Sequence, residues 1–157
     1  MVNKILIIGS GAREHAIVRA LDRSPQEKEL YCLASNMNPG IAEICDELTV
    51  GKMSDPDFVV NYAQETAATL AIIGPENPLE NGVADALWNV GVKTVGPKQK
   101  LAQLETSKAF TRNLLKEFVI PGCPKYQTFD SMDGVAEFLK ELKENYVVKY
   151  DGLMGGK

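Results

Sequence analysis

Apolar and polar residues alternate in blocks along the first hundred residues, and each block predicts a strand or a helix. An apolar run over 5–8 predicts a strand that is buried on both faces. Three more strands are expected over 29–34, 70–73 and 92–95, with helix-period patterns between them. Strands that alternate with helices in this way predict an α/β fold with a doubly wound parallel sheet, which is a Rossmann-like architecture.

The helices between these strands have recognisable beginnings. The first begins directly after a glycine turn at 9–11, and the second begins at Asp55, a cap residue that is followed by Pro56. A third helix is predicted over 79–90, where apolar residues recur every three or four positions.

The pattern changes near residue 104, and we expect an N-terminal domain over 1–103 and the beginning of a second domain over 104–157. In the second part, Phe110, Leu114 and Phe118 recur every four residues and predict a helix. The remaining elements that we expect are a strand over 126–129, a helix capped by Ser131 and carrying Val135, Phe138, Leu139 and Leu142, and a strand over 146–149.

The turn after the first strand has the composition of an anion site. Gly9 and Gly11 let the backbone turn sharply, and the following helix start offers unpaired N–H groups to a phosphate. A dinucleotide-binding loop would need a third glycine where this chain has Glu14, and an acidic residue where 35–38 carries none. The turn therefore favours a phosphate-bearing ligand over NAD, with a purely structural strand-to-helix turn as the alternative.

Other short segments strengthen the case for a ligand site. Four segments follow the carboxyl ends of predicted strands: 9–11, 35–40, 74–77 and 96–98. In a parallel sheet such segments meet at one edge, where doubly wound folds bind ligands. Arg13, Glu76 and Asn77 would supply polar groups there. Taken singly, each glycine-proline pair is also compatible with a turn that has only a structural role.

A second glycine-rich segment lies between Lys149 and Lys157, directly after the strand expected over 146–149. Glycines allow the backbone to approach nucleotide phosphates closely, and the lysines would neutralise their charge. A flexible tail is the alternative interpretation. The order of strand, glycines and lysines favours the phosphate-binding interpretation.

The composition of the chain indicates its cellular environment and argues against some classes of binding partner. The net charge of −4, with no basic cluster, argues against nucleic acid and anionic membranes. The N-terminal apolar run is too short for a signal peptide or a membrane span. Three cysteines without CxxC spacing indicate a reduced, cytoplasmic protein.

Five blocks carry a resemblance that spans the whole chain: 8–16, 74–79, 96–97, 104–110 and 147–153. In this order and spacing, the chain resembles the N-terminal portion of the phosphoribosylamine–glycine ligases, also called glycinamide ribonucleotide synthetases. The resemblance implies a substrate-binding domain followed by the start of an ATP-grasp domain. It also implies ATP-dependent ligation of glycine to 5-phosphoribosylamine in purine biosynthesis, through a glycyl phosphate.

The same resemblance implies which residues bind ligands. The expected phosphoribosylamine-binding residues are Gly9, Ser10, Gly11, Arg13, Glu14, Gly74, Pro75 and Glu76. The expected nucleotide-binding residues are Lys108, Lys149, Gly152, Gly155, Gly156 and Lys157. ATP would act with Mg²⁺ or Mn²⁺ in the complete enzyme, whose metal ligands and catalytic residues are not expected in this chain. His15 also matches the family, and we assign it no chemistry.

Some residues depart from the family pattern, and some alternatives stay open. The departures are Ala12, Thr106, Tyr150, Met154 and Gly155, and none of them removes a charged group. We expect an N-terminal fragment that is inactive alone, with self-association or a C-terminal partner covering its second part. The alternatives are another ATP-grasp ligase, such as a carboxylase, a non-catalytic ribose-phosphate or nucleotide-binding module, and the docking half of a split ligase.

Overall fold

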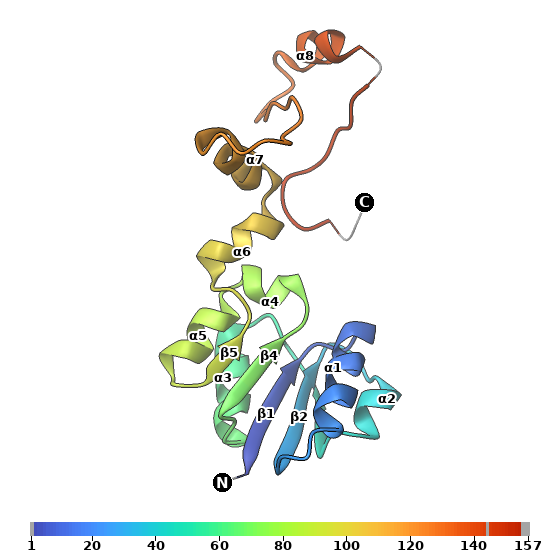
Figure 1. The fold of residues 1–157 in the computed structure, drawn as a ribbon, viewed down its shortest axis with the longest axis vertical. Helices are drawn as coiled ribbons and strands as arrows, with labels where there is room; N and C mark the ends of the chain where they lie inside the picture. Colours follow the sequence, from blue (N-terminus) through green and yellow to red (C-terminus); the bar gives the residue numbers. More distant parts are fainter. Residues whose placement is uncertain (1, 144, 155–157) are drawn as a thin grey trace. The chain divides into compact units, whose positions relative to one another are not determined.

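The computed structural model describes residues 2–143 and 145–154, which fall into two compact units, Met1–Ala102 and Gln103–Lys157 (Figure 1). The strands of the first unit are β1 (Asn3–Ile8), β2 (Lys28–Ala34), β3 (Glu47–Val50), β4 (Leu70–Ile73) and β5 (Lys93–Val95). Its helices are α1 (Ala12–Asp22), α2 (Pro39–Ala42), α3 (Pro56–Glu65), α4 (Glu76–Glu80) and α5 (Val83–Asn89), and α6 (Gln99–Thr106) follows.

The five strands form one sheet in the order β3-β2-β1-β4-β5, and every neighbouring pair is parallel. The predicted doubly wound parallel sheet is therefore confirmed. The chain moves from β1 to one side of the sheet and returns to β4 on the other side, so the strand order reverses at β1. Ile8 lies opposite both Leu33 and Ile73, so β1, β2 and β4 end close to the same level.

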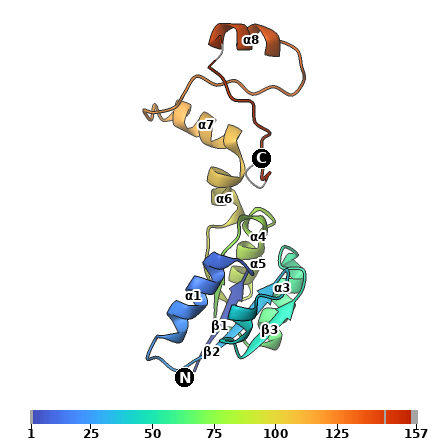
Figure 2. The same cartoon turned by 90° about the vertical axis from the view of Figure 1, so that its right-hand side faces the viewer.

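Apolar side chains on both faces of the sheet form two cores. Leu6, Ile8 and Leu33 pack against α3 and α5 on one face. Ile5 and Ile7, which alternate with them along the strand, pack with α1 and α2 on the other face. Figure 2 shows α1 and α3 on opposite sides of the sheet. The prediction that the first strand is buried on both faces is confirmed.

Two features of this unit differ from the sequence prediction. The single helix expected over 79–90 is divided into α4 and α5, because Gly82 adopts a left-handed φ of +80° at the cap of α5. Strand β3 and the short helix α2 were not expected. Only four residues long and without a buried residue, β3 has too little apolar pattern to be detected.

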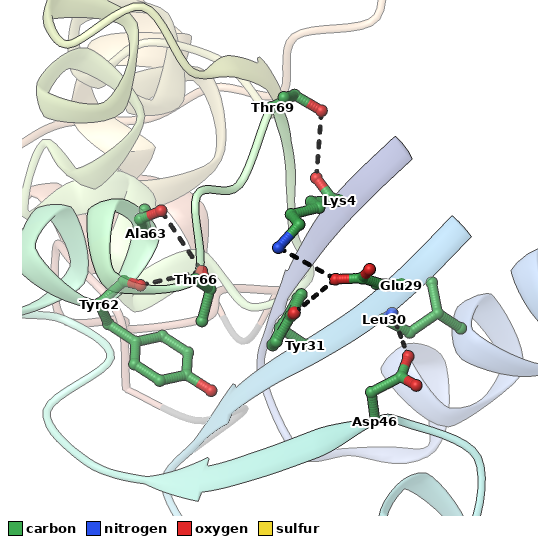
Figure 3. Close-up of polar contacts among 9 residues, drawn as sticks. All are labelled: Lys4, Glu29, Leu30, Tyr31, Asp46, Tyr62, Ala63, Thr66 and Thr69. Atoms are coloured by element: carbon green, nitrogen blue, oxygen red, sulfur yellow. Dashed lines mark hydrogen bonds and ion pairs between the residues drawn. The ribbon is translucent and has the colours of Figure 1, made fainter. Parts of the chain in front are cut away.

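A polar cluster joins the amino ends of β1 and β2, at the end of the strands away from the predicted ligand edge. Lys4 Nζ lies 3.1 Å from a Glu29 carboxylate oxygen, and the Tyr31 hydroxyl donates to the same carboxylate at 2.7 Å (Figure 3). These two contacts, the Tyr31 hydrogen bond first, lower the pKa of Glu29. The carboxylate of Asp46 accepts the backbone N–H of Leu30 at 2.8 Å. These contacts hold the beginnings of β1 and β2 together.

The second unit contains α7 (Lys108–Glu117) and α8 (Val135–Leu142). Both strands expected here, over 126–129 and 146–149, are wrong: these residues have no regular secondary structure and no ladder partner among the residues that the structure describes. A strand is defined by hydrogen bonds to a neighbour, which an apolar pattern alone cannot supply. The expected cap of the later helix is also wrong, because Gly134 precedes α8 and the Ser131 hydroxyl instead contacts Asp133.

The second unit has no closed core in its described part. Phe110, Leu114 and Leu139 are half-buried, and Phe118 is 63% exposed. The residues of 146–150 are all exposed, with Val147 and Val148 each more than 70% exposed. Within residues 2–143 and 145–154, no helix is long and apolar enough to cross a membrane.

Candidate functional site

The carboxyl ends of the central strands bring the predicted substrate segments together. The N–H of Gly74 donates to the carbonyl of Ile8 at 3.0 Å, and the N–H of Gly9 donates to the carbonyl of Leu33 at 2.9 Å. The turns after β1, β2 and β4 therefore leave the sheet side by side. This is the position where the strand order reverses, and doubly wound folds bind ligands there.

The Glu14 side chain fills the centre of this edge. Glu14 is only 4% exposed, and its Oε2 accepts the backbone N–H of Gly11, the residue that caps α1, at 2.6 Å. A Cβ atom on Gly74 would lie 2.0 Å from Glu14 Oε1, and one on Gly9 would lie 2.6 Å from Glu14 Cγ. Gly9 also has a φ of +130°, which side chains rarely allow. The Glu14 side chain thus leaves no room for a Cβ atom at Gly9 or Gly74.

This arrangement explains the missing third glycine of the first loop. The side chain at position 14 folds back into the turn, and it occupies the N–H of Gly11 that sequence analysis offered to a phosphate. The other oxygen, Oε1, is buried and has no hydrogen-bond partner among the described residues. The first turn of α1 therefore already contains a carboxylate from the protein itself, that of Glu14.

Arg13 and Glu76 connect the two central turns across the edge. The Arg13 guanidinium donates to Glu76 Oε1 at 3.1 Å, with the two side chains 69% and 29% exposed. A hydrogen bond from its own backbone N–H, and then the Arg13 guanidinium, lower the pKa of Glu76. Pro75 caps α4 between Gly74 and Glu76. The pair places a positive and a negative charge at the two central turns of the edge.

Two residues that sequence analysis did not select complete the edge on the β2 side. The hydroxyl oxygens of Ser10 and Ser35 lie 3.1 Å apart, and the Asn38 side-chain amide donates to the Ser10 carbonyl at 2.9 Å. The only signal for Ser35 and Asn38 was the position of their segment after a predicted strand. The His15 ring packs on Gly40, where a Cβ would lie 2.3 Å from the ring Cε1.

The edge offers hydrogen-bonding and charged groups rather than a reactive thiol. Cys32, which lies beneath the first turn, is fully buried and donates its S–H to the Gly9 carbonyl at 3.3 Å. Burial raises the pKa of the Cys32 thiol to about 12, so it stays protonated at neutral pH.

The second unit brings two predicted nucleotide-binding residues together through Asp151, which sequence analysis did not select. Asp151 accepts the backbone N–H groups of Lys108 and Ala109 at 2.6 and 3.2 Å, and the Ser107 hydroxyl at 2.9 Å. The Lys108 ammonium donates to the Gly152 carbonyl at 2.7 Å. The start of the glycine-rich segment is thus attached to the first turn of α7.

For the other predicted nucleotide-binding residues, the structure shows no comparable contact among the described residues. Lys149 is exposed, and it lies two residues before Asp151. Gly155, Gly156 and Lys157 lie outside the described residues. The described part of the chain contains no group of three or more histidine, cysteine, aspartate or glutamate side chains that could hold a metal ion.

The fold defines the first unit as an α/β domain of the doubly wound class. Comparison with known proteins then identifies the family. Residues 3–105 match the family described as phosphoribosylglycinamide synthetase, N domain, and residues 106–157 match its ATP-grasp (A) domain. The chain belongs to the phosphoribosylglycinamide synthetase family.

Individual relatives agree with this family. The phosphoribosylamine–glycine ligase of Methanosarcina barkeri is 43% identical over 154 residues, which are 98% of this chain and 35% of the relative. That of Methanosphaera stadtmanae is 46% identical over 98% of this chain and 34% of the relative. The chain therefore spans about a third of the length of the curated relatives that it matches.

Solved structures show the same fold at low sequence identity. An ADP complex of an N5-carboxyaminoimidazole ribonucleotide synthetase superposes with a TM-score of 0.74 at 17% identity, covering all of this chain and 40% of that chain. The phosphoribosylglycinamide synthetase of Anaerococcus prevotii superposes with a TM-score of 0.67 at 15% identity, covering 91% of this chain and 35% of that chain. These likenesses establish the fold alone, and the sequence match distinguishes this family from the carboxylases.

Proposed function

We propose that this chain forms the phosphoribosylamine-binding part and the first ATP-binding segment of a phosphoribosylamine–glycine ligase. The observation that carries the proposal is the consecutive match of the N domain and the ATP-grasp domain of one family along the chain. The alternatives of a different ATP-grasp carboxylase and of a non-catalytic module have only the shared fold in their favour.

In the proposed reaction, the glycine carboxylate attacks the γ-phosphorus of ATP, which gives glycyl phosphate and ADP. The amine of phosphoribosylamine then attacks the glycyl carbonyl, forms the amide bond, and expels inorganic phosphate as the amine loses a proton. The role of the N-terminal edge is to hold the amine at the reacting carbonyl, since positioning lowers the barrier of a two-substrate reaction.

We assign the substrate to the edge formed by Gly9, Ser10, Gly11, Arg13, Glu14, Gly74, Pro75 and Glu76. Glu76, partly exposed and held by Arg13, suits the ribose hydroxyls or the amine, because an ionised carboxylate only accepts hydrogen bonds. Ser10 and Ser35 add hydroxyl groups from the other side of the first turn.

We assign ATP to the region of Lys108, Lys149 and Gly152. The Lys108 ammonium, held at the Gly152 carbonyl, brings a positive charge to the beginning of a glycine-rich segment, which fits the chemistry of nucleotide phosphates. The described carboxylates do not form a set that could hold Mg²⁺ or Mn²⁺. No ligand for the metal that accompanies ATP is therefore assigned among residues 2–143 and 145–154.

Calorimetry with the stable product glycinamide ribonucleotide tests the substrate assignment. We expect saturable binding of this product and none of bicarbonate or biotin, which are the substrates expected of the alternative carboxylases. Glu76→Gln should weaken binding about tenfold, since one charge-assisted contact is lost. Glu65→Gln, an exposed carboxylate at the end of α3, is the matched control and should bind normally.

A chimaera tests the activity. We expect no glycine-dependent ADP release from the 157-residue chain alone. When the chain replaces the matching third of the Methanosarcina barkeri relative, we expect ADP release that depends on both glycine and phosphoribosylamine. A folded chimaera that bound glycinamide ribonucleotide but required bicarbonate instead of glycine would contradict the proposal.

A further inference from the structure

The proposed function includes Glu14 in the substrate edge, but it does not explain why a carboxylate lies in the first turn of α1. Helix α1 is eleven residues long, so its N-terminus is electropositive and would ordinarily attract an anion. Glu14 Oε2 already accepts the Gly11 N–H at 2.6 Å. The other oxygen, Oε1, is buried without a hydrogen-bond partner among the described residues, although most buried polar atoms have one.

The place of this carboxylate is built by residues from both central turns. Cβ positions at Gly9, Gly11 and Gly74 would all lie within 3 Å of Glu14 side-chain atoms. The side chain thus lies between the turn after β1 and the turn after β4, which are joined by the hydrogen bond from the Gly74 N–H to the Ile8 carbonyl. A carboxylate enclosed on both sides by backbone has little freedom to move away from an incoming ligand.

A phosphoryl group in this turn would meet the same carboxylate. It would compete with Glu14 for the Gly11 N–H, and it would bring a second negative charge beside the unpaired Oε1. Like charges repel strongly where water is excluded. Hydroxyl and amine groups meet no such repulsion, because they donate hydrogen bonds to carboxylates.

We infer that Glu14 is a specificity-determining residue, which closes the Gly11 turn to phosphoryl groups and directs this part of the edge toward the hydroxyl or amine end of the ligand. The inference refines the proposed phosphoribosylamine site and depends on that function only for the identity of the ligand. The phosphate of such a ligand would then lie elsewhere than on the Gly11 N–H. Exclusion of a phosphoryl group can be measured whatever the physiological substrate is.

Amide NMR of the 157-residue chain with inorganic phosphate and pyrophosphate tests the inference. In the wild-type chain we expect no saturable shift of the Gly9, Gly11 or Gly74 amide signals. Glu14→Gly removes the carboxylate and creates the third glycine of the loop, and it should bind pyrophosphate about tenfold more tightly or better. Glu14→Gln keeps the shape without the charge and should show a smaller gain. Glu65→Gln should behave as the wild-type chain.

The results that would overturn this inference differ from those that would overturn the proposed function. A saturable shift of the wild-type Gly11 amide with either anion would overturn the inference. It would also be overturned if the folded Glu14→Gln variant, and Glu14→Gly where that variant folds, bound pyrophosphate no more tightly than the wild-type chain. Failure of the proposed function has a different signature, namely absence of glycinamide ribonucleotide binding, and it leaves these inorganic-anion results unchanged.

Discussion

Helices α1 and α7 both begin at a carboxylate that accepts backbone N–H groups, and these two carboxylates come from different places in the sequence. Glu14 lies three residues after the cap of α1 and is buried. Its carboxylate accepts one N–H, and its side chain packs closely against Gly9, Gly11 and Gly74. Asp151 comes from a distant part of the sequence, is exposed, and accepts two N–H groups and the Ser107 hydroxyl at the start of α7. The first contact lies in tightly packed surroundings, and the second attaches a segment without regular secondary structure to a helix.

The difference shows how the two units are stabilised. Around Glu14, tight packing decides the structure, so a single added methyl group should be costly. Around Asp151, the described residues include no fully buried apolar side chain, so polar contacts hold the segment. Exposed charge-assisted contacts are weak and are screened by salt. The two sites should therefore respond differently to mutation, salt and pH.

The largest effect is expected for Gly74→Ala. The new Cβ would lie 2.0 Å from Glu14 Oε1 and 2.5 Å from its Cγ, so either the turn or the Glu14 side chain must move. We expect a loss of about 3 kcal/mol in the free energy of unfolding of the first unit. Urea denaturation followed by Trp88 fluorescence measures this value.

Gly91→Ala is the matched control for that substitution. Gly91 has a left-handed φ of +84°, and nothing lies within 4 Å of its Cβ position, so only the backbone cost of about 1 kcal/mol is expected. Equal losses for the two variants would show that the space around Glu14 is not tightly packed.

A smaller loss is expected for Glu14→Ala. The substitution removes the acceptor of the Gly11 N–H and leaves a cavity between the glycines, while it also relieves the unpaired Oε1. We expect a net loss of about 1–2 kcal/mol, nearly independent of salt. Urea denaturation at low and at high salt measures it, and a loss that disappears at high salt would mean that charge, rather than packing, dominates here.

For Asp151→Ala we expect an effect confined to the second unit. The amides of Lys108 and Ala109 lose their acceptor, so their hydrogen exchange should accelerate by up to about tenfold, while urea denaturation of the first unit stays unchanged. The exposed residue Asp130 provides the control variant Asp130→Ala. Unchanged exchange at Lys108 would contradict the attachment of the segment to α7.

The smallest effect is the pH response of the same contact. Burial tends to raise the pKa of Asp151, but hydrogen bonds from the Ala109 N–H, the Ser107 hydroxyl and the Lys108 N–H outweigh it and lower the pKa. Because the folded pKa is depressed, the stabilisation is complete above the ordinary value of 3.8 and is lost as the pH falls through the folded pKa. The Lys108 amide signal should titrate with a midpoint below 3.8, and Asp151→Asn should abolish that titration.

Much of the first unit could be predicted from sequence, because its signals are local. Strands β1, β2, β4 and β5 lie where strands were predicted, and the turns that follow them form the predicted ligand edge. Strand β3 was missed because its residues are only partly buried, and the strands expected at 126–129 and 146–149 were wrong because strand formation needs a partner. Whether the predicted edge residues bind substrate stays a prediction.

The sequence by itself determined the parallel α/β fold, the membership of the family, and the glycine turn at Gly9 and Gly11. Only the tertiary structure decided what occupies that turn. Glu14 can lie there because the register of β4 beside β1 brings Gly74, a residue without a Cβ, against its carboxylate. Asp151 likewise contacts α7 from a distant part of the sequence, 43 residues after Lys108. A local pattern can specify a turn and a helix start, whereas close contact between distant segments depends on packing of the whole unit.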